Sequence, residues 1–234
     1  MTVYILSREF MGFPDPASAS ADGLLAVGGD LSVERLVAAY ARGVYPWYDE
    51  RSPILWWSPD PRLVLAPKDL HIPKSLIKVI RKRKFEITLD TAFERVIEGC
   101  ARAGRAKGPG TWLIPDMVRA YTSLHEAGCC HSVEAWAGDK LAGGLYGVSL
   151  GRVFFGESMF FHVPDASKTA FVYLARLLES WDFEMIDCQQ TTGHLRRFGA
   201  REVARAEFLD RLKSALESED RLGKWSLPQG FNAL

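Results

Sequence analysis

The spacing of apolar and polar residues predicts an alternation of helices and strands after residue 62. Apolar residues three or four apart predict helices over 74–84, 90–100, 115–128, 165–181 and 206–217. Alternating positions predict strands over 62–65, 85–89, 131–136, 141–148, 153–161 and 184–189, several of them joined by glycine-containing turns. These elements predict an α+β fold with a mainly antiparallel sheet flanked by helices.

The first 62 residues show a different pattern, in which glycine and proline mark turns between short elements. Ser32 is a suitable N-cap for a short helix that ends at Gly43. Aromatic residues then cluster at Tyr45–Tyr48 and at 54–57, more densely than a linker requires. We therefore expect a small N-terminal domain over residues 1–62 and a larger domain over residues 63–234.

Two strands on either side of an apolar helix carry a group of polar residues. Side chains alternate between the two faces of a strand, so Asp187 and Gln189 should share a face, as should Glu157, Met159 and Phe161. The neighbouring residues are largely aromatic or aliphatic, which predicts a buried sheet. Buried carboxylates are rare unless they are paired or used in chemistry, so these strands form a candidate active site. The simpler alternative is that Asp187 and Gln189 only satisfy backbone groups at a strand end.

Composition limits the class of protein. With 47% hydrophobic residues over 234 positions, the chain can bury one large core, or one core and a small additional domain. Its apolar runs are far shorter than the ~20 residues of a transmembrane helix, and residues 1–8 lack the features of a signal peptide. We therefore expect a cytoplasmic protein that does not act on membranes. The four cysteines form no C-x-x-C pair and no metal-ligand spacing with the five histidines, so we expect reduced thiols and no metal site.

The chain has no net charge, but basic residues concentrate in its middle segment. Residues 63–110 contain eleven Lys and Arg against five Asp and Glu. Six of these basic residues fall on one predicted helix after Pro73: Lys74, Lys78, Arg81, Lys82, Arg83 and Lys84. The helix is either a solvated face or a phosphate-contacting surface. No acidic residue interrupts the run to form i,i+4 pairs, which favours the second interpretation.

Seven stretches, taken in their order and spacing, resemble the leucyl/phenylalanyl-tRNA–protein transferase family. They cover nearly the whole chain: Gly23–Leu31, Pro46–Trp47, Ile54–Arg62, Gly110–Trp112, Gly156–Phe160, Ala166–Ala170 and Ile186–Gln189. The resemblance implies a small N-terminal domain on a larger acetyltransferase-like (GNAT-like) domain, and no cofactor. It implies an enzyme that moves Leu or Phe, with Met as a candidate third donor, from aminoacyl-tRNA to the α-amine of proteins that begin with Arg or Lys. Such a transfer marks the acceptor protein for degradation.

The same resemblance implies roles for the residues of the predicted site. The Gln189 carbonyl would accept a hydrogen bond from the attacking amine, while Asp187 would either orient the group or relay the proton. Glu157 would read the cationic N-terminal residue of the acceptor. Met159 would line a pocket for the Leu or Phe side chain.

Recognition of the donor tRNA divides into two surfaces. By resemblance, Trp47 and Trp112 stack on the terminal adenosine, with Tyr40 and Tyr121 nearby. The basic run between residues 74 and 84 would hold phosphates of the acceptor stem without reading sequence.

Two other functions stay open on the sequence alone. An acyl-CoA-dependent N-acyltransferase could share the fold, but it needs a pyrophosphate-binding turn of the form Gln/Arg-x-x-Gly-x-Gly/Ala after a strand. The nearest match, Arg196–Arg201, fails at its last position and follows the candidate catalytic strand. A non-catalytic tRNA-binding module would use only the basic helix and the tryptophans, and Asp187 would then be structural. The sequence does not define the oligomeric state, and we expect a monomer.

Overall fold

The structure is a computed structural model that describes residues 3–105 and 113–234. Its strands are β1 (Tyr4–Leu6), β2 (Leu24–Gly28), β3 (Tyr45–Pro46), β4 (Leu55–Trp57), β5 (Arg62–Leu65), β6 (Glu86–Leu89), β7 (Cys130–Ala137), β8 (Lys140–Leu150), β9 (Val153–Phe161), β10 (Met185–Gln189) and β11 (Arg201–Val203). Its helices are α1 (Val33–Tyr40), α2 (Lys74–Arg81), α3 (Phe93–Arg105), α4 (Pro115–Glu126), α5 (Ala166–Ser180), α6 (Gly193–Arg196) and α7 (Arg205–Ala215). Among the helices of these described residues, none is long and apolar enough to cross a bilayer. The mixture of helices and sheets confirms the predicted α+β class.

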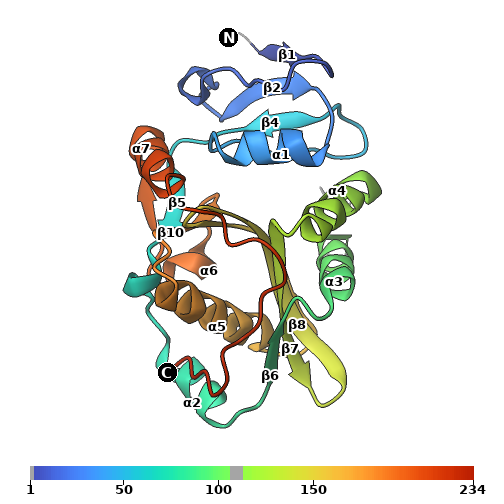
Figure 1. The fold of residues 1–234 in the computed structure, drawn as a ribbon. Coiled ribbons are helices and arrows are strands. Elements are labelled where there is room, and N and C mark those ends of the chain that lie inside the picture. The colour runs from blue at the N-terminus through green and yellow to red at the C-terminus, as the bar shows by residue number, and fades with distance from the viewer. Residues whose placement is uncertain (1–2, 106–112) are drawn as a thin grey trace.

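The smaller sheet is formed by the N-terminal part of the chain, with strand order β1-β2-β4-β3 (Figure 1). Helix α1 packs beside it and begins after Ser32, whose hydroxyl oxygen accepts a hydrogen bond from the Arg35 backbone N–H, as expected for an N-cap. Gly43, with a φ of +69°, lets the chain turn sharply after the helix. This turn leads into β3, whose Tyr45 ring lies against the guanidinium of Arg62 at the start of β5 in the larger sheet.

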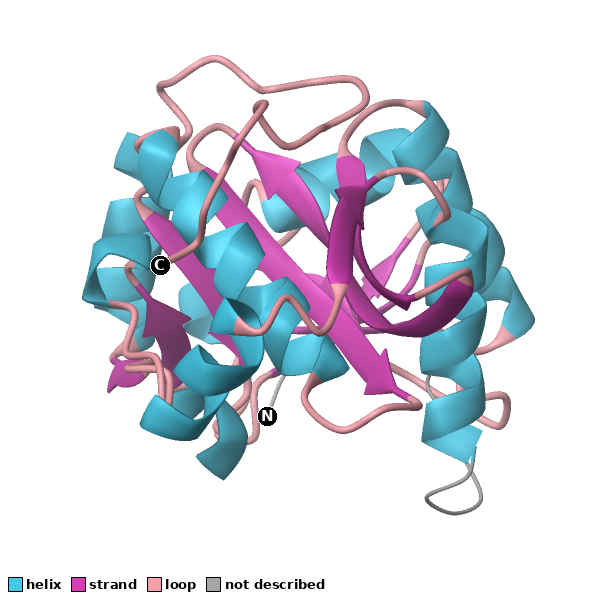
Figure 2. Cartoon of the chain, turned by 90° about the horizontal axis from the view of Figure 1, so that it is seen from below, coloured by secondary structure: helices cyan, strands magenta, loops and turns pink. Residues whose placement is uncertain are grey.

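The larger sheet has seven strands in the order β11-β5-β10-β9-β8-β7-β6. Neighbouring strands run antiparallel except β9 and β10, which run parallel. Helices α3 and α4 pack on one face and α5 and α2 on the other, so helices flank the strands on both sides (Figure 2). Each face has its own apolar core, and the core beneath α3 and α4 continues into the smaller sheet. The predicted sheet type is therefore correct, and the domain boundary near residue 62 stays a prediction.

Strand β9 contains an extra residue at the predicted site. Gly156 and Ser158 lie opposite two consecutive residues of β8, so Glu157 is a bulged residue between them. Such a bulge moves every later side chain to the other face of the strand. Met159 consequently packs against the core beneath α5, whereas Glu157 bonds tyrosines of the opposite core. The prediction that Glu157 and Met159 share a face was wrong, because it assumed a regular strand.

Strand β10 has a similar irregularity at its end. Asp187 and Gln189 lie opposite consecutive residues of β5, so Cys188 is the extra residue. Gln189 adopts a left-handed backbone with a φ of +58°. The parallel pairing of β10 with β9 ends at Asp187, opposite Phe155. Beyond this pair the two strands no longer share a register.

The basic helix is shorter than predicted. Helix α2 ends at Arg81, Lys82 follows as its C-cap, and Arg83 has a left-handed φ of +49°. Arg83 and Lys84 therefore lie on the turn after the helix, because a left-handed residue cannot continue it. Helix α2 packs against α5 and lies at the end of the molecule opposite the smaller sheet (Figure 1).

The chain after α7 runs back along the larger sheet toward α2 (Figure 1). Trp225 fixes this segment, since its backbone N–H donates to a carboxylate oxygen of Asp90 at 2.7 Å. The Trp225 indole stacks on His131 with 3.7 Å between ring centres, and His131 Nδ1 lies 2.8 Å from the same carboxylate. The C-terminal segment is thus attached to β7 and to the turn after β6.

Candidate active site

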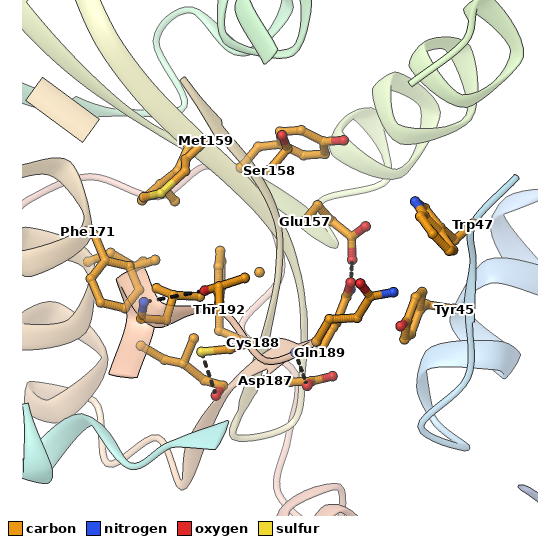
Figure 3. A pocket seen from close by; sticks show the side chains of 18 of the residues that line it. Tyr45, Trp47, Glu157, Ser158, Met159, Phe171, Asp187, Cys188, Gln189 and Thr192 are labelled. Carbon is orange, nitrogen blue, oxygen red and sulfur yellow. Dashed lines mark hydrogen bonds between the residues drawn. The ribbon is translucent and has the colours of Figure 1, made fainter. Parts of the chain in front are cut away.

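A cavity of about 250 Å³ lies where β9 and β10 separate (Figure 3). Strands β3, β8, β9 and β10 contribute to its wall, together with α5 and the start of α6. One end of the cavity is apolar, and the other carries polar side chains and faces the smaller sheet (Figure 3). The cavity therefore offers one environment for a hydrocarbon side chain and another for polar chemistry.

The apolar end is formed by aliphatic and aromatic side chains of β8, β9, β10 and α5. These are Leu145, Phe154, Met159, Phe171, Leu174 and Ile186. A closed apolar cavity of about 150 Å³ accommodates benzene in another protein. The present cavity has about 250 Å³ over its apolar and polar ends together, which is room for a group the size of a Leu or Phe side chain. Met159 lies on this wall, and its contact with a donor side chain stays a prediction.

Glu157 lies at the polar end and receives hydrogen bonds from three side chains. Tyr40 Oη donates to Glu157 Oε1 at 2.7 Å, and Tyr121 Oη donates to Oε2 at 2.8 Å. Gln189 Nε2 donates to Oε1 at 2.9 Å. The two phenol oxygens are also only 2.6 Å apart. The hydrogen bonds that Tyr40, Tyr121 and Gln189 donate favour the charged form of this carboxyl.

Burial raises the pKa of Glu157 to about 7, because it removes water from the charged carboxylate. The hydrogen bonds from Tyr40, Tyr121 and Gln189 act in the opposite direction, and the negative charge of Asp187 adds to the increase. A carboxyl group with such a pKa exchanges its proton near neutral pH, which is a property of acid–base and charge-recognition groups.

Asp187 is fully buried and forms a bidentate ion pair with Arg62, which is also fully buried. Arg62 Nε donates to Asp187 Oδ1 at 2.9 Å, and Arg62 Nη2 donates to Oδ2 at 2.6 Å. Asp187 Oδ1 also accepts the backbone N–H of Gln189 at 2.8 Å. The carboxylate is therefore held in one orientation, and its bond to the Gln189 N–H fixes the backbone at the end of β10.

Gln189 connects the two carboxylates of the site. Its backbone N–H bonds Asp187, and its side-chain amide N–H bonds Glu157. The side-chain oxygen of Gln189 accepts no hydrogen bond within residues 3–105 and 113–234, and Gln189 lines the cavity. This oxygen is open to an N–H group of a bound molecule.

Strand β3 and the residue after it form the wall of the cavity on the side of the smaller sheet (Figure 3). Trp47 lines the cavity and is 40% exposed. Its backbone carbonyl accepts a hydrogen bond from Trp57 Nε1 at 2.6 Å, and the two indole rings pack edge to face. Contacts with Trp57 thus hold Trp47 in place, while part of its ring stays exposed and could stack on a base.

The structure brings some of the predicted site residues together and separates others. Five of them line the cavity: Trp47, Glu157, Met159, Asp187 and Gln189. Tyr40 and Tyr121 are fully buried, and both support Glu157 from the side away from the cavity lining. Trp112 lies outside the described residues. The six basic residues lie on α2 or on the turn after it, and the lining among described residues includes none of them.

Sequence reasoning missed Arg62 and Tyr45, and it missed the residues of α5 and α6 that complete the wall. A buried Asp187 signals that a cation must lie nearby, but the chain has 29 Lys and Arg residues that could provide it. Phe171 and Leu174 follow the ordinary spacing of a buried helix face, so the pattern does not distinguish a cavity wall from a filled core.

Comparison with known proteins relates this site to a family. The family model described as leucyl/phenylalanyl-tRNA protein transferase matches residues 64–213, and the model of that transferase's N-terminal domain matches residues 29–60. A protein named leucyl/phenylalanyl-tRNA–protein transferase from Oleidesulfovibrio alaskensis is 59% identical, over 100% of this chain and 96% of its own length. Its namesake from Nitratidesulfovibrio vulgaris is 56% identical over 99% of both chains.

Another protein of the same name, from a species of Anaeromyxobacter, is 57% identical over 98% of this chain and 97% of its own. Among solved structures, a conserved protein of unknown function from Bacteroides thetaiotaomicron aligns with 79% of this chain and 62% of its own at a TM-score of 0.42 and 13% identity, too weak a likeness to support a conclusion. The similarity to the Oleidesulfovibrio sequence spans the whole chain, and with it the segments that form the cavity. The chain belongs to the leucyl/phenylalanyl-tRNA–protein transferase family of enzymes.

Proposed function

We propose that the protein transfers Leu or Phe from aminoacyl-tRNA to the α-amine of proteins that begin with Arg or Lys. The observation that supports this most is the cavity, whose lining joins an apolar end to a polar end that carries Glu157 and Gln189. The names of the similar proteins supply the donor, leucyl- or phenylalanyl-tRNA, and a protein acceptor. A carboxylate at the polar end supplies a physical reason for a cationic acceptor.

The reaction needs little covalent catalysis, because the aminoacyl ester on tRNA is already activated. The amine nitrogen attacks the ester carbonyl, the new C–N bond forms, the bond to the ribose oxygen breaks, and that oxygen takes up the proton that the amine loses. The free side-chain oxygen of Gln189 would accept a hydrogen bond from an N–H of the attacking amine. This bond would direct the lone pair of the amine nitrogen toward the ester carbonyl. Asp187 is bound by Arg62 and by the Gln189 backbone, which favours an orienting role over a proton relay. Glu157 would bind the cationic N-terminal residue.

The donor would be held at two places. The exposed ring of Trp47 would stack on the terminal adenosine, with Trp112 expected as a second ring. Met159 would contact the Leu or Phe side chain, and Tyr40 and Tyr121 would act indirectly by holding Glu157. The basic residues from Lys74 to Lys84 would bind phosphates of the acceptor stem.

The wider setting follows from the same proposal. Residues 1–62 would act as a small domain that presents Trp47, and residues 63–234 as an acetyltransferase-like domain. The separation of β9 and β10 around a binding cavity supports the second assignment. The enzyme would work as a cytoplasmic monomer, and its product would be marked for degradation.

A transfer assay tests the proposed function directly. The protein is incubated with radiolabelled Leu-tRNA and a peptide that begins with Arg, and in parallel with labelled acetyl-CoA and the same peptide. Label should enter the peptide only from Leu-tRNA, and a peptide that begins with Ala should stay unlabelled. Transfer from acetyl-CoA would refute the proposal in favour of a CoA-dependent acyltransferase.

The CoA-dependent alternative gains no support from the turn at Arg196–Arg201. Arg196 ends α6 and pairs with Glu202 at 2.6 Å, whereas Arg201 begins β11 and pairs with Asp69 at 3.4 Å. Both guanidinium groups are therefore engaged. The segment also joins a helix to a strand, while a pyrophosphate-binding turn of this kind follows a strand.

The tRNA surface is tested by the salt dependence of binding. Replacing Arg81, Lys82, Arg83 and Lys84 by Gln should weaken binding of every donor tRNA. The slope of log affinity against log salt is negative, and it should become shallower by about 1 for each phosphate that the variant no longer neutralises. Filter binding at several salt concentrations measures this slope, with Lys140→Gln at the exposed start of β8 as control. An unchanged slope in the fourfold variant would place the tRNA elsewhere.

A further inference from the structure

Arg62 is a fully buried arginine whose role the transfer chemistry leaves unexplained. It begins β5, which lies between β10 and β11 in the larger sheet. A guanidinium group removed from water costs free energy unless other groups replace its hydration. Its partners are therefore informative about what it does.

On the side of the larger sheet, Arg62 holds the reacting strand. Its Nε and Nη2 atoms donate to both carboxylate oxygens of Asp187, at 2.9 and 2.6 Å. Asp187 passes this constraint to the Gln189 backbone N–H, at 2.8 Å. Because Gln189 follows an irregular strand end with a φ of +58°, its position depends on this bond rather than on regular sheet pairing.

On the side of the smaller sheet, Arg62 holds the segment that leads to Trp47. Its Nη1 atom donates to the Gly43 carbonyl at 3.1 Å. The ring of Tyr45 lies over the guanidinium at 4.9 Å, and the ring of Phe208 on α7 lies at 4.5 Å. A Cβ at Gly43 would approach Phe208 Cε1 to 2.7 Å, so this segment has little freedom to shift.

One guanidinium group thus contacts two segments that meet at the cavity. Gly43 precedes Tyr45 and Trp47, and both of these line the cavity. Asp187 precedes Gln189, which lines the same cavity from the other side. The two segments belong to different sheets and are far apart in the sequence, so their relative placement is set by tertiary contacts such as these.

We propose that Arg62 is a positioning residue for the transfer reaction, because it fixes the Gly43–Trp47 segment relative to Gln189. This inference rests on the proposed function, in which Trp47 holds the donor adenosine and Gln189 holds the attacking amine. A displacement of about 1 Å between reacting groups can lower a rate by about 10²-fold. Only the planar fork of arginine can serve one carbonyl and two carboxylate oxygens together, whereas lysine presents a single point charge.

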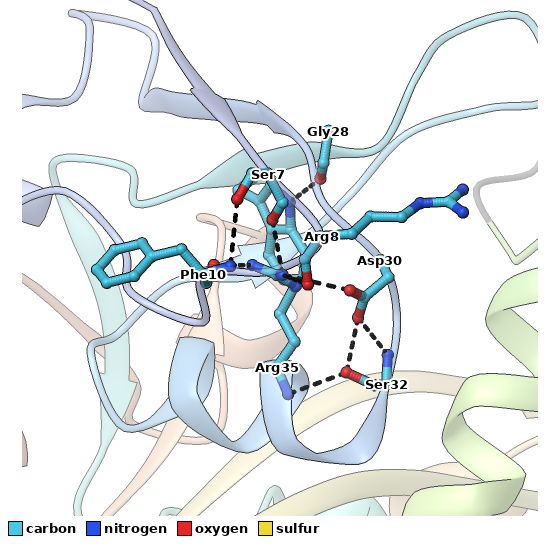
Figure 4. Close-up of polar contacts among 8 residues, drawn as sticks. Ser7, Arg8, Phe10, Gly28, Asp30, Ser32 and Arg35 are labelled. Carbon is cyan, nitrogen blue, oxygen red and sulfur yellow. Dashed lines mark hydrogen bonds and ion pairs between the residues drawn. The ribbon is translucent and has the colours of Figure 1, made fainter.

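Arg35 offers a matched control, because it is also a fully buried arginine (Figure 4). Its guanidinium donates to the carbonyls of Phe10, Ser7 and Arg8 at 3.2, 2.9 and 3.3 Å, and it pairs with Asp30 at 3.2 Å. In the described part of the chain, the cavity lining includes none of these partners. Replacing Arg35 therefore perturbs a buried arginine without touching the site.

The first experiment compares Arg62→Lys with Arg35→Lys at a temperature below the melting point of both variants. We expect kcat for transfer from Leu-tRNA to fall about 10²-fold in Arg62→Lys, with KM for the donor changed less than about threefold, because phosphate contacts dominate tRNA affinity. Arg35→Lys should keep kcat within about twofold of wild type, as expected for a site that binds no substrate. Wild-type kcat in Arg62→Lys, or equal losses in the two variants, would overturn the inference while the proposed function stands.

The second experiment does not depend on activity, so it separates this inference from the proposed function. Native-state hydrogen exchange monitors the Trp47 amide, which donates to the Leu55 carbonyl at 3.0 Å, and the Gln189 amide, which donates to Asp187. Both amides should lose protection in Arg62→Lys and keep it in Arg35→Lys. In the wild-type protein the two amides should open with the same dependence on denaturant, a measurement that holds even if Arg62→Lys fails to fold. Separate opening of the two amides would overturn the inference, and an inactive wild-type enzyme with joint opening would overturn only the proposed function.

Discussion

Arg35 and Arg62 are both fully buried, yet the groups that compensate their charges differ in kind. Arg35 donates to three backbone carbonyls and pairs with Asp30, whose side chain is 28% exposed. Arg62 donates to one carbonyl and pairs with Asp187, whose side chain is 0% exposed. Arg35 keeps its backbone carbonyl acceptors if its partly hydrated carboxylate partner is removed. Asp187 is fully buried, so loss of either member of its pair with Arg62 leaves an uncompensated charge. The first arginine holds the N-terminal segment, and the second holds the end of β10 through Asp187.

The largest difference in stability and activity between the two networks is expected when the carboxylate partner of each arginine is replaced by alanine. Asp187→Ala leaves a buried charge unpaired and should lower the free energy of unfolding by about 3–5 kcal/mol, with loss of transfer activity. Asp30→Ala leaves Arg35 with its carbonyl acceptors and should cost about 1 kcal/mol, with activity retained. Urea denaturation and the transfer assay measure both effects. Equal losses of stability would show that the two buried arginines are equivalent.

A milder change sharpens the same comparison. Asp187→Asn keeps an oxygen that can accept the Gln189 backbone N–H, so it should retain more transfer activity than Asp187→Ala at the same folded fraction. If Asp187 instead relayed a proton, the two variants would be equally inactive.

The two networks also differ in their response to pH. Burial opposes ionisation of Asp30, but hydrogen bonds from Ser32 and Arg35 outweigh it and the pKa of Asp30 is lowered. Burial raises the pKa of Glu157 to about 7. Transfer should therefore increase about tenfold per pH unit below that pKa, as Glu157 ionises and attracts the cationic acceptor. Glu157→Gln should remove this contribution and leave only the increase that deprotonation of the attacking α-amine produces, whereas Glu134→Gln, which alters a buried carboxylate on β7, should preserve both.

Stability should show the opposite sign. The pKa of Glu157 is raised from its ordinary value of 4.5 to about 7, so the folded protein binds more protons than the unfolded chain between these values. The stabilisation is complete below pH 4.5 and is lost as pH rises through 7. The melting temperature of Glu157→Gln should therefore rise relative to wild type between pH 5 and pH 8. A difference that is independent of pH would contradict the assignment of this titration to Glu157.

The smallest effect on activity is expected from a substitution at the apolar end of the cavity. Leu174→Phe should reduce the space for the donor side chain and lower kcat/KM for Phe-tRNA about tenfold more than for Leu-tRNA. Leu209→Phe on α7 adds the same ring outside this cavity and should leave the ratio unchanged. Equal effects of the two substitutions would place the donor side chain elsewhere.

Most elements of the fold were predictable from periodicity, because their apolar faces repeat over many residues. The helices after Ser32 and Pro115 and the meander of β7, β8 and β9 follow this rule. The bulge at Glu157 interrupts the strand periodicity, and the one local indication of it in the sequence is Gly156 within the strand pattern. The end of α2 was misplaced because Arg83 adopts a left-handed backbone, which the run of basic residues did not indicate.

The site was predictable to the extent that its residues lie on one or two strands. Glu157, Asp187 and Gln189 were identified by strand pattern and resemblance, and they line one cavity. Arg62 was not, because it is 125 residues from Asp187 and only the folded sheet brings them together. Tyr40 lies 117 residues from Glu157, so its role as a support behind the carboxylate could not be read from local spacing.

The bulge in β9 has a consequence for how such enzymes can evolve. Glu157 occupies a position that the pairing of β9 with β8 does not require, since Gly156 and Ser158 already face consecutive residues. A chain lacking this one residue would keep the same strand pairs on both sides and would lose the carboxylate with its hydrogen bonds to Tyr40, Tyr121 and Gln189. Under the proposed function, insertion or deletion of this one residue would therefore add or remove recognition of the acceptor without changing the pairing of the sheet.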